Sequence, residues 1–290
     1  MHWLLFFLLT LLWGPSFLVI KIGLNGFPPL TLAAGRVTIA AVLLYVFMRI
    51  SGDRFPRDRG FWKKFMIMGL LANAIPFSLL MIGESLSTSA LAAIFNGFTP
   101  VATAIIAHAV IPEERLNGLT LTGVIAGFGG ILLLFLPSLL GQGVQGEDIL
   151  PGSLAFTGMA VSYGASMVYS RRALRGYPRF VGPTAQLLCA TIALLPVALI
   201  IEWNSLRIPD AESIGALLWL AVIATAIAYI VYYRLLELTG ATFLSLVTFL
   251  LPPFGAILGV LFLDETLGWN AIAGCGLILL GTGFVRNRGK

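Results

Sequence analysis

The stretches FNGFTPVATAIIA (residues 95–107) and VTFLLPPFGAILGVLF (residues 247–262) each place a proline in the middle of a long apolar run. Inside an ordinary helix a proline costs about 3 kcal/mol, because it removes a backbone hydrogen bond and its ring collides with the preceding turn. Pro252 lies 252 − 100 = 152 positions after Pro100. A destabilising proline at two related positions predicts an internal duplication in which both prolines have a function.

The composition is that of an integral membrane protein. The 290 residues are 58% hydrophobic and 11% charged, with a mean hydropathy of +0.96, whereas soluble proteins carry about 25% charged residues. Apolar windows of about 20 residues recur, and each is long enough to cross a bilayer as a helix. We therefore expect an all-α fold. The formal charge of +5 is attributed to basic cytoplasmic loops and not to nucleic-acid binding.

Ten transmembrane helices are predicted, joined by loops too short to hold a soluble domain. The predicted spans are 3–23, 30–49, 64–82, 89–111, 117–137, 153–171, 183–202, 213–235, 240–263 and 268–286. Basic residues concentrate in alternate loops, on the side of the N-terminus, and acidic residues in the opposite loops. The positive-inside rule then places both termini in the cytoplasm, in the inner membrane of a bacterium.

The two halves of the sequence align with each other. LLWGPSFLVIK (11–21) matches VSYGASMVYSR (161–171) at an offset of 150, and Asn73 matches Thr225 at an offset of 152. Several such matches in order along the chain indicate a repeat, with units 3–137 and 153–286. Because each unit holds five spans, an odd number, the second unit enters the membrane from the opposite face. Such inverted-topology repeats are typical of transporters.

Candidate substrate-binding residues are the polar and aromatic side chains near mid-membrane, because transporter sites lie at that depth between the repeats. They are Trp13, Ser16, Phe17, Asn73, Phe77, Phe95, Asn96, Phe98, Thr99, Tyr163 and Tyr229. Helix breakers at the same level are expected to shape the cavity and act as hinges: Pro15, Pro76, Pro100 and Pro252. Hinges are expected in helices one, three, four, six, eight and nine, with helices five and ten as a scaffold.

Ionisable residues are scarce inside the predicted spans, and no carboxylate lies near mid-membrane, which disfavours exchange of protons for cations. Arg36 lies within the second span, Lys21 at the outer face and Glu84 at the outer end of the third span. These three side chains are interpreted as a structural cluster. The alternative is that Arg36 attracts a substrate carboxylate.

The sequence resembles the EamA family of the drug/metabolite transporter superfamily. The resemblance rests on LLWGPSFLVIK (11–21), PPLTLAAGRVTIAAVLL (28–44), FTPVATAII (98–106), ERLNGLTLTGVIAGFGGI (114–131) and ETLGWNAIAGCGLILLG (265–281), and so covers essentially the whole chain. Within the family it looks most like the YddG-type exporters of amino acids, including aromatic ones. Two departures are Gln186, in place of a second-half counterpart of Arg36, and Tyr163, in place of an expected tryptophan.

Together with the resemblance, these features predict an exporter in a bacterial inner membrane that moves small metabolites, amino acids first, by alternating access. A drug or neutral-metabolite exporter is the alternative. A nucleotide-sugar or sugar-phosphate carrier is disfavoured, because phosphate would need several deep basic residues. No motif of an intramembrane enzyme is present. We expect no cofactor, no metal and no nucleic acid, only a small-molecule substrate and the lipid bilayer as partners, and a monomer with a dimer as the alternative.

Overall fold

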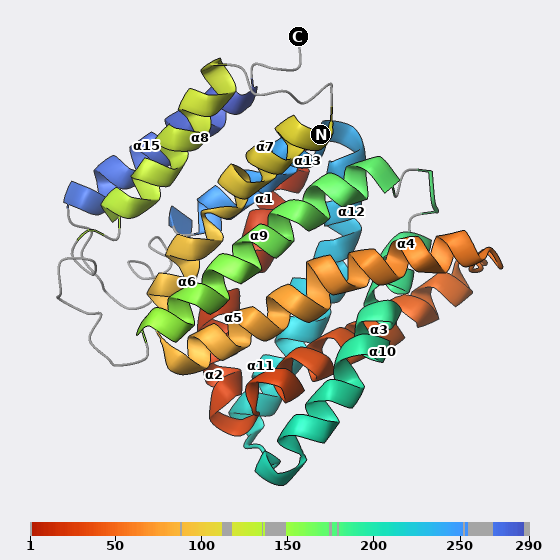
Figure 1. Cartoon of the computed structure of the whole chain (residues 1–290). Helices are drawn as coiled ribbons and strands as arrows, with labels where there is room; N and C mark the ends of the chain where they lie inside the picture. Colours follow the sequence, from red (N-terminus) through yellow and green to blue (C-terminus); the bar gives the residue numbers. More distant parts are fainter. Residues whose placement is uncertain are drawn as a thin grey trace.

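The computed structural model describes residues 2–87, 89–111, 118–134, 136, 149–173, 176–178, 180–251, 253–254 and 269–286. These residues form helices joined by short turns (Figure 1). Large apolar side chains cover much of the surface, and Leu4, Ile50 and Ile200 are 72%, 77% and 81% exposed. In lipid such a surface has no cost, and a helix satisfies its own backbone polar groups there.

The first half of the chain contains three helical stretches that are interrupted and two that are continuous. In chain order the elements are α1 (His2–Trp13), α2 (Ser16–Gly26), α3 (Pro29–Ile50), α4 (Arg59–Gly69), the π-helical segment η1 (Leu70–Ala74), α5 (Ile75–Leu86), α6 (Ser89–Asn96), α7 (Thr99–Val110) and α8 (Gly118–Leu134).

The second half repeats much of this order. Its elements are α9 (Ile149–Ala173), α10 (Val181–Glu202), the short 3₁₀ segment η4 (Trp203–Ser205), α11 (Ala211–Ala221), the π-helical segment η5 (Val222–Ile227), α12 (Ala228–Thr239), α13 (Ala241–Ser245) and α15 (Trp269–Arg286).

Helix bounds recur at a constant spacing between the halves. The ends of α3 and α10 differ by 152 residues, as do those of α4 and α11, and η5 begins 152 residues after η1. The helix caps follow the same spacing, because Asp58 accepts backbone hydrogen bonds at the start of α4 and Asp210 does so at the start of α11. This register pairs Arg36 with Leu188, so Gln186 is not its counterpart.

Equivalent helices of the two halves pack side by side and run antiparallel. The Glu202 carboxylate, at the end of α10, accepts hydrogen bonds from the Leu30 and Thr31 amides at the start of α3, at 3.0 and 2.7 Å. In α8 and α15, which lie together at one edge of the molecule (Figure 1), a Cβ on Gly281 would lie 2.5 Å from the Gly123 carbonyl and one on Gly130 would lie 2.7 Å from the Gly274 carbonyl. Only glycine permits this approach.

The remaining contacts between the halves are reciprocal. Helix α2 packs on α11 and α1 on α12, while α9 packs on α5 and η1. Gly14 faces Phe254, and Gly164 faces Ala102, the residue 152 positions before Phe254. A contact between i and j that is repeated between their counterparts is what a two-fold arrangement produces.

Among the described residues, six helical stretches are long and apolar enough to cross a membrane: His2–Gly26, Pro29–Ile50, Arg59–Leu86, Leu91–Val110, Val181–Ser205 and Ala211–Thr239. Leu121–Leu133 and Ile272–Gly281 are shorter apolar helices. The chain is therefore a multi-pass membrane protein by composition and length. Ten spans remain a prediction, since residues 255–268 of the ninth lie outside the described part of the chain.

Most of the expected interruptions coincide with breaks in helices. Pro15 lies between α1 and α2, Pro100 follows the Gly97–Phe98 turn, and Pro76 follows η1. The expectation of a hinge in helix six is wrong, because α9 is continuous and contains Gly164 instead of a mid-span proline. Pro252 lies outside the described residues.

Candidate functional site

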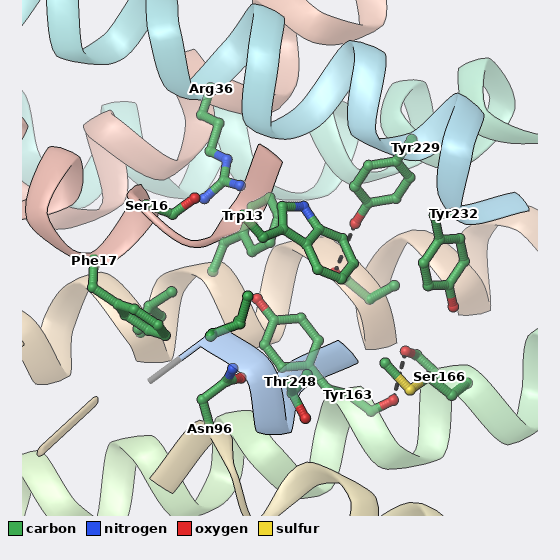
Figure 2. A pocket seen from close by; sticks show the side chains of 15 residues that line it. Trp13, Ser16, Phe17, Arg36, Asn96, Tyr163, Ser166, Tyr229, Tyr232 and Thr248 are labelled. Atoms are coloured by element: carbon green, nitrogen blue, oxygen red, sulfur yellow. Dashed lines mark hydrogen bonds between the residues drawn. The ribbon is translucent and has the colours of Figure 1, made fainter. Parts of the chain in front are cut away.

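A cavity lies at the middle of the bundle, where the interrupted helices of both halves meet (Figure 2). Its wall combines aromatic, hydroxyl, amide and aliphatic side chains with one cation. The lining residues are Trp13, Ser16, Phe17, Arg36, Ala72, Phe77, Leu80, Asn96, Tyr163, Ser166, Met167, Tyr229, Tyr232, Thr248 and Leu251.

The π-helical segment η5 forms one side of the cavity and leaves a carbonyl free. The Ala228 amide bonds to the Ile223 and Thr225 carbonyls, so that the Ala224 carbonyl loses its usual helical donor. The Trp13 indole N–H donates to it at 3.0 Å, from the break between α1 and α2. A buried carbonyl needs such a partner, and this bond fixes the indole at the cavity wall.

Arg36 on α3 reaches the same segment. Its Nε donates to the Thr225 hydroxyl at 2.7 Å and its Nη2 to the Ala224 carbonyl at 3.3 Å. The guanidinium carbon lies 4.0 Å from the centroid of the Phe77 ring, a cation–π geometry. The side chain is only 3% exposed, so these contacts hold a charged group deep inside the protein.

The π-helical segment η1 supports the opposite wall. Here the Ile75 amide bonds to the Leu70 carbonyl, and the Leu71 carbonyl accepts instead from the Ser162 hydroxyl at 2.7 Å. Pro76 has no N–H to offer the Ala72 carbonyl, which accepts from the Tyr229 hydroxyl at 3.3 Å. Both π segments therefore use side chains of the other half to satisfy freed carbonyls.

A buried hydrogen-bond chain runs outward from Tyr229. The Asn73 amide nitrogen donates to the Tyr229 hydroxyl at 2.7 Å, the Gln186 amide nitrogen donates to Asn73 Oδ1 at 2.5 Å, and the Tyr233 hydroxyl donates to Gln186 Oε1 at 2.5 Å. Tyr233 also lines a separate hollow with Arg234, at the end of α12. The chain of bonds thus lies between the central cavity and the end of the bundle where α12 terminates.

Aromatic rings form the remaining walls. Phe77 and Tyr163 meet edge to face with centroids 6.4 Å apart, and Tyr229 and Tyr232 stack at 5.7 Å. Trp13 lies 6.1 Å from Tyr232. These rings come from both halves of the chain, and they give a flat apolar solute several faces to contact.

Seven of the eleven candidate substrate-binding residues line the cavity: Trp13, Ser16, Phe17, Phe77, Asn96, Tyr163 and Tyr229. The other four lie elsewhere. Asn73 is behind Tyr229, Phe95 packs near Phe156, Phe98 packs on Phe128 beside α8, and Thr99 is buried within α7. These four residues are not among those that line the cavity.

Sequence reasoning left several lining residues out of the candidate set: Arg36, Ala72, Leu80, Ser166, Met167, Tyr232, Thr248 and Leu251. Two of them carried a usable signal. Ser166 is the counterpart of Ser16 at offset 150, and Tyr232 lies about one helical turn after Tyr229. Arg36 had been assigned to a structural cluster, with a substrate role only as the alternative.

That cluster forms differently from the expectation. Lys21 Nζ donates to the Ser87 carbonyl at 2.8 Å and also to the Glu84 carbonyl, so it caps the end of α5, and it forms no ion pair with a carboxylate in the described part of the chain. The Glu84 side chain is fully buried and accepts a hydrogen bond from the Ser89 hydroxyl at 3.2 Å. Among the described residues, no group of His, Cys, Asp and Glu side chains is arranged to hold a metal ion.

Comparisons with known proteins identify the family. The model of the EamA-like transporter family matches residues 1–136 and again residues 150–287. The uncharacterized transporter YoaV of Bacillus subtilis is 25% identical over 276 residues, covering 94% of this chain and 92% of that protein. A probable amino-acid metabolite efflux pump of Salmonella typhimurium is 27% identical over 296 residues, covering 94% and 91%.

A similar protein of Escherichia coli, also named a probable amino-acid metabolite efflux pump, is 26% identical over 296 residues and covers 94% and 91% of the two chains. One solved crystal structure shares the fold, with a TM-score of 0.76 and 23% identity over 97% of this chain and 96% of that one. The family model alone covers nearly the whole sequence. This chain belongs to the EamA-like transporter family, within the drug/metabolite transporter superfamily.

Proposed function

We propose that this protein exports small zwitterionic metabolites, amino acids and their aromatic members first, across the bacterial inner membrane by alternating access. The observation that carries the proposal is the central cavity, which interrupted helices of both halves build from aromatic, amide and hydroxyl groups with one cation. A wall of this kind suits an amphipathic solute of low net charge.

The arrangement of the halves supports the mechanism. The family model matches twice, and helix bounds recur 152 residues apart. Equivalent helices run antiparallel, because Glu202 at the end of α10 bonds to the amides at the start of α3. We interpret these features as two inverted five-helix repeats with ten spans and both termini cytoplasmic. Such repeats have two nearly equivalent packings, which is what alternating access requires.

Hydrogen-bonded side chains lie on two sides of the cavity. The Tyr229–Asn73–Gln186–Tyr233 chain separates it from the end where α12 terminates, and Lys21, Glu84 and Ser89 cluster beyond Phe17 toward the other end. The cavity volume of about 70 Å³ has room for only a few water molecules. Entry of an amino acid therefore requires the walls to move, and the helix breaks at Pro15, Pro76 and Pro100 are the proposed hinges.

Two related functions are less well supported. Of the described residues that line the cavity, none is a carboxylate, so a lipophilic cation lacks a counter-ion among them. Arg36 is the one basic residue in this described lining, whereas a nucleotide sugar or sugar phosphate would need several cations. The names of the Salmonella and Escherichia coli relatives, probable amino-acid metabolite efflux pumps, support the amino-acid assignment.

Counterflow in proteoliposomes tests the proposal. Vesicles that contain the purified protein and are preloaded with unlabelled L-tryptophan or L-threonine should accumulate the labelled amino acid, and protein-free vesicles should not. A matched control is Phe7→Ala, since Phe7 is 55% exposed on α1, away from the cavity. Equal counterflow with and without protein for every amino acid, but exchange of a lipophilic cation, would assign the protein to drug export instead.

A further inference from the structure

Arg36 is a buried cation whose hydrogen-bond partners are all neutral. Its guanidinium group bonds to the Thr225 hydroxyl and the Ala224 carbonyl and stacks on the Phe77 ring. Removing a charge from water without a counter-ion is expensive, by several kcal/mol for an ion in a protein interior. The described contacts offset part of this cost, and none of these three partners is an anion.

Among the described residues, no carboxylate forms an ion pair with Arg36. The nearest carboxylate on the neighbouring helix, Glu84, lies two turns of α5 beyond Phe77, and its side chain bonds to the Ser89 hydroxyl. Lys21, the other cation at that end, caps α5 through backbone carbonyls. Among the described residues Arg36 therefore makes no hydrogen bond to a carboxylate, and Glu84 acts on its charge only from a distance.

Ser16 provides a second and independent observation. Its hydroxyl is buried, with the residue only 8% exposed, and it has no hydrogen-bond partner. Ser16 and Arg36 both line the cavity, and their polar ends point toward one another in Figure 2. A buried hydroxyl without a partner costs about 1–3 kcal/mol, so its position at this wall indicates a group that is supplied by a ligand.

We propose that Arg36 and Ser16 form the carboxylate subsite of the transported solute. An arginine has five N–H donors, and the bonds to Thr225 and Ala224 use one on Nε and one on Nη2. The remaining edge of the guanidinium group suits a carboxylate, which accepts two parallel N–H bonds, while the Ser16 hydroxyl donates a third. Trp13, Phe77 and Tyr163 then surround the rest of the solute.

This inference rests on the proposed amino-acid transport and specifies which part of the substrate is recognised. It predicts discrimination between acids and their neutral derivatives. L-Tryptophanamide has the same ring and amino group as L-tryptophan but no carboxylate, whereas indole-3-propionate keeps the carboxylate and lacks the amino group. In wild-type protein, tryptophan should bind at least about tenfold more tightly than its amide, since the lost group pairs with a buried charge.

The experiment measures binding to the purified protein and, in parallel, competition with tryptophan counterflow, for all three compounds. Arg36→Gln should bring the acid-to-amide ratio to about one, because the charge is gone. Arg36→Lys should keep part of the preference, since it retains the charge but not the paired donors. Ser16→Ala should lower the ratio by a few fold. Lys21→Gln, a loss of charge outside the cavity, should leave the ratio unchanged.

Wild-type protein that binds acid and amide equally would overturn the subsite, and so would an Arg36→Gln variant that keeps the full preference. If Arg36→Gln does not fold, the wild-type ratio and the Ser16→Ala variant still decide. Failure of the proposed function has a different result, namely no counterflow of any amino acid, and the equilibrium binding ratio then tests the subsite on its own.

Discussion

The two π-helical segments, η1 and η5, lie at equivalent places in the two halves but contribute different chemistry to the cavity. At η5, the freed Ala224 carbonyl accepts from Trp13 and from the cation Arg36. At η1, freed carbonyls accept from the neutral groups Ser162 and Tyr229. Their central polar residues, Asn73 and Thr225, are 152 positions apart: Thr225 accepts from Arg36, and Asn73 bonds to Tyr229 and Gln186.

The comparison shows that the backbone of the cavity wall follows the repeat, whereas the charged side chain does not. Both halves place a π-helical segment at equivalent positions and satisfy its freed carbonyls from the opposite half, so this part of the cavity wall follows the repeat. The charge follows only one half, because position 188, the counterpart of Arg36, is a leucine. Among the described lining residues the charge therefore lies on one side of the cavity. Under the proposed function this gives an amphipathic zwitterion one way to orient.

The largest expected effect is on the counterparts Asn73 and Thr225. Asn73→Leu should lower the free energy of unfolding by about 3 kcal/mol, because it leaves buried polar atoms of both Gln186 and Tyr229 without their partner. Thr225→Val should cost about 2 kcal/mol, since it removes one acceptor from a charged donor. Thermal unfolding in detergent measures both, and a Thr225→Val variant less stable than Asn73→Leu would reverse the comparison.

The next effect concerns the glycines where the first helix of each half meets the fourth helix of the other half. A Cβ at Gly164 would lie 2.9 Å from the Thr103 backbone nitrogen, whereas one at Gly14 would meet the Phe254 ring at 2.2 Å. A ring can rotate away and a helix backbone cannot. Gly164→Ala should therefore destabilise the protein by about 1–3 kcal/mol, and Gly14→Ala by less.

Unfolding temperatures of the two glycine variants test this order of stability. Gly215→Ala is the control, because no atom lies within 4 Å of a Cβ at that position. Equal stability of the Gly164→Ala and control proteins would contradict the close packing of α9 on α7.

A smaller effect, on transport, is expected at the counterparts Trp13 and Tyr163. Trp13→Phe keeps a ring but removes the donor to the Ala224 carbonyl, so the transport rate should fall by about fivefold, the equivalent of one hydrogen bond. Tyr163→Phe removes a hydroxyl and keeps the edge-to-face contact with Phe77, and it should have less effect. Alanine at either position should impair transport more, with little change in folded yield.

Counterflow at matched protein density compares these variants. Wild-type rates in both alanine variants would mean that the central cavity is not on the transport path.

The smallest effect is expected at the helix caps Asp58 and Asp210, 152 residues apart. Each carboxylate accepts backbone hydrogen bonds at the first turn of its helix, Asp58 from Gly60 and Phe61, and Asp210 from Ser213. Asp58→Ala should cost about 1 kcal/mol, and Asp210→Ala should change stability in the same direction. Asparagine, which keeps an acceptor, should restore most of the loss.

The Asp210 cap also has a defined pH dependence. The Ser213 amide bond lowers the pKa of this carboxyl below its usual value. A lowered folded-state pKa means that the contribution is present above the unfolded-state pKa and is lost as the pH falls through the folded-state value. The protection factor of the Ser213 amide, the observed exchange rate corrected for its intrinsic pH dependence, should therefore fall in acid in the wild type but not in Asp210→Asn. Identical protection profiles in acid would exclude the cap as the titrating group.

Several parts of the fold were predictable because they depend on local chemistry. Apolar runs must be helical in lipid, and Pro15, Pro76 and Pro100 mark places where a helix cannot continue unchanged. The π-helical segment η5 contains no proline. Only its equivalence to the η1 region, 152 residues earlier in the repeat, indicated a break at this place. The hinge expected in α9 is absent because glycine alone does not interrupt a helix.

The cavity was only partly predictable, for a geometric reason. Depth follows from counting residues at 1.5 Å each, and this places Phe95, Phe98 and Thr99 at the level of Tyr163. Which side of the helix faces the cavity is set by packing, and a span that is apolar all round carries no signal of its facing side. The turn at Gly97–Phe98 changes that side again, so Asn96 lines the cavity and Phe98 packs on Phe128.

The sequence by itself determined that the chain is helical, that it belongs in a bilayer and that it is built from two related halves, because composition, apolar run length and residue spacing are properties of the chain alone. Only the tertiary structure decided which groups meet. It buries Arg36 beside an unpaired Ser16 hydroxyl, without a carboxylate partner among the described residues, and it places Asn73 behind Tyr229. The bonds of Arg36 to Thr225 and of Asn73 to Tyr229 join positions more than 150 residues apart, and they depend on how the halves pack.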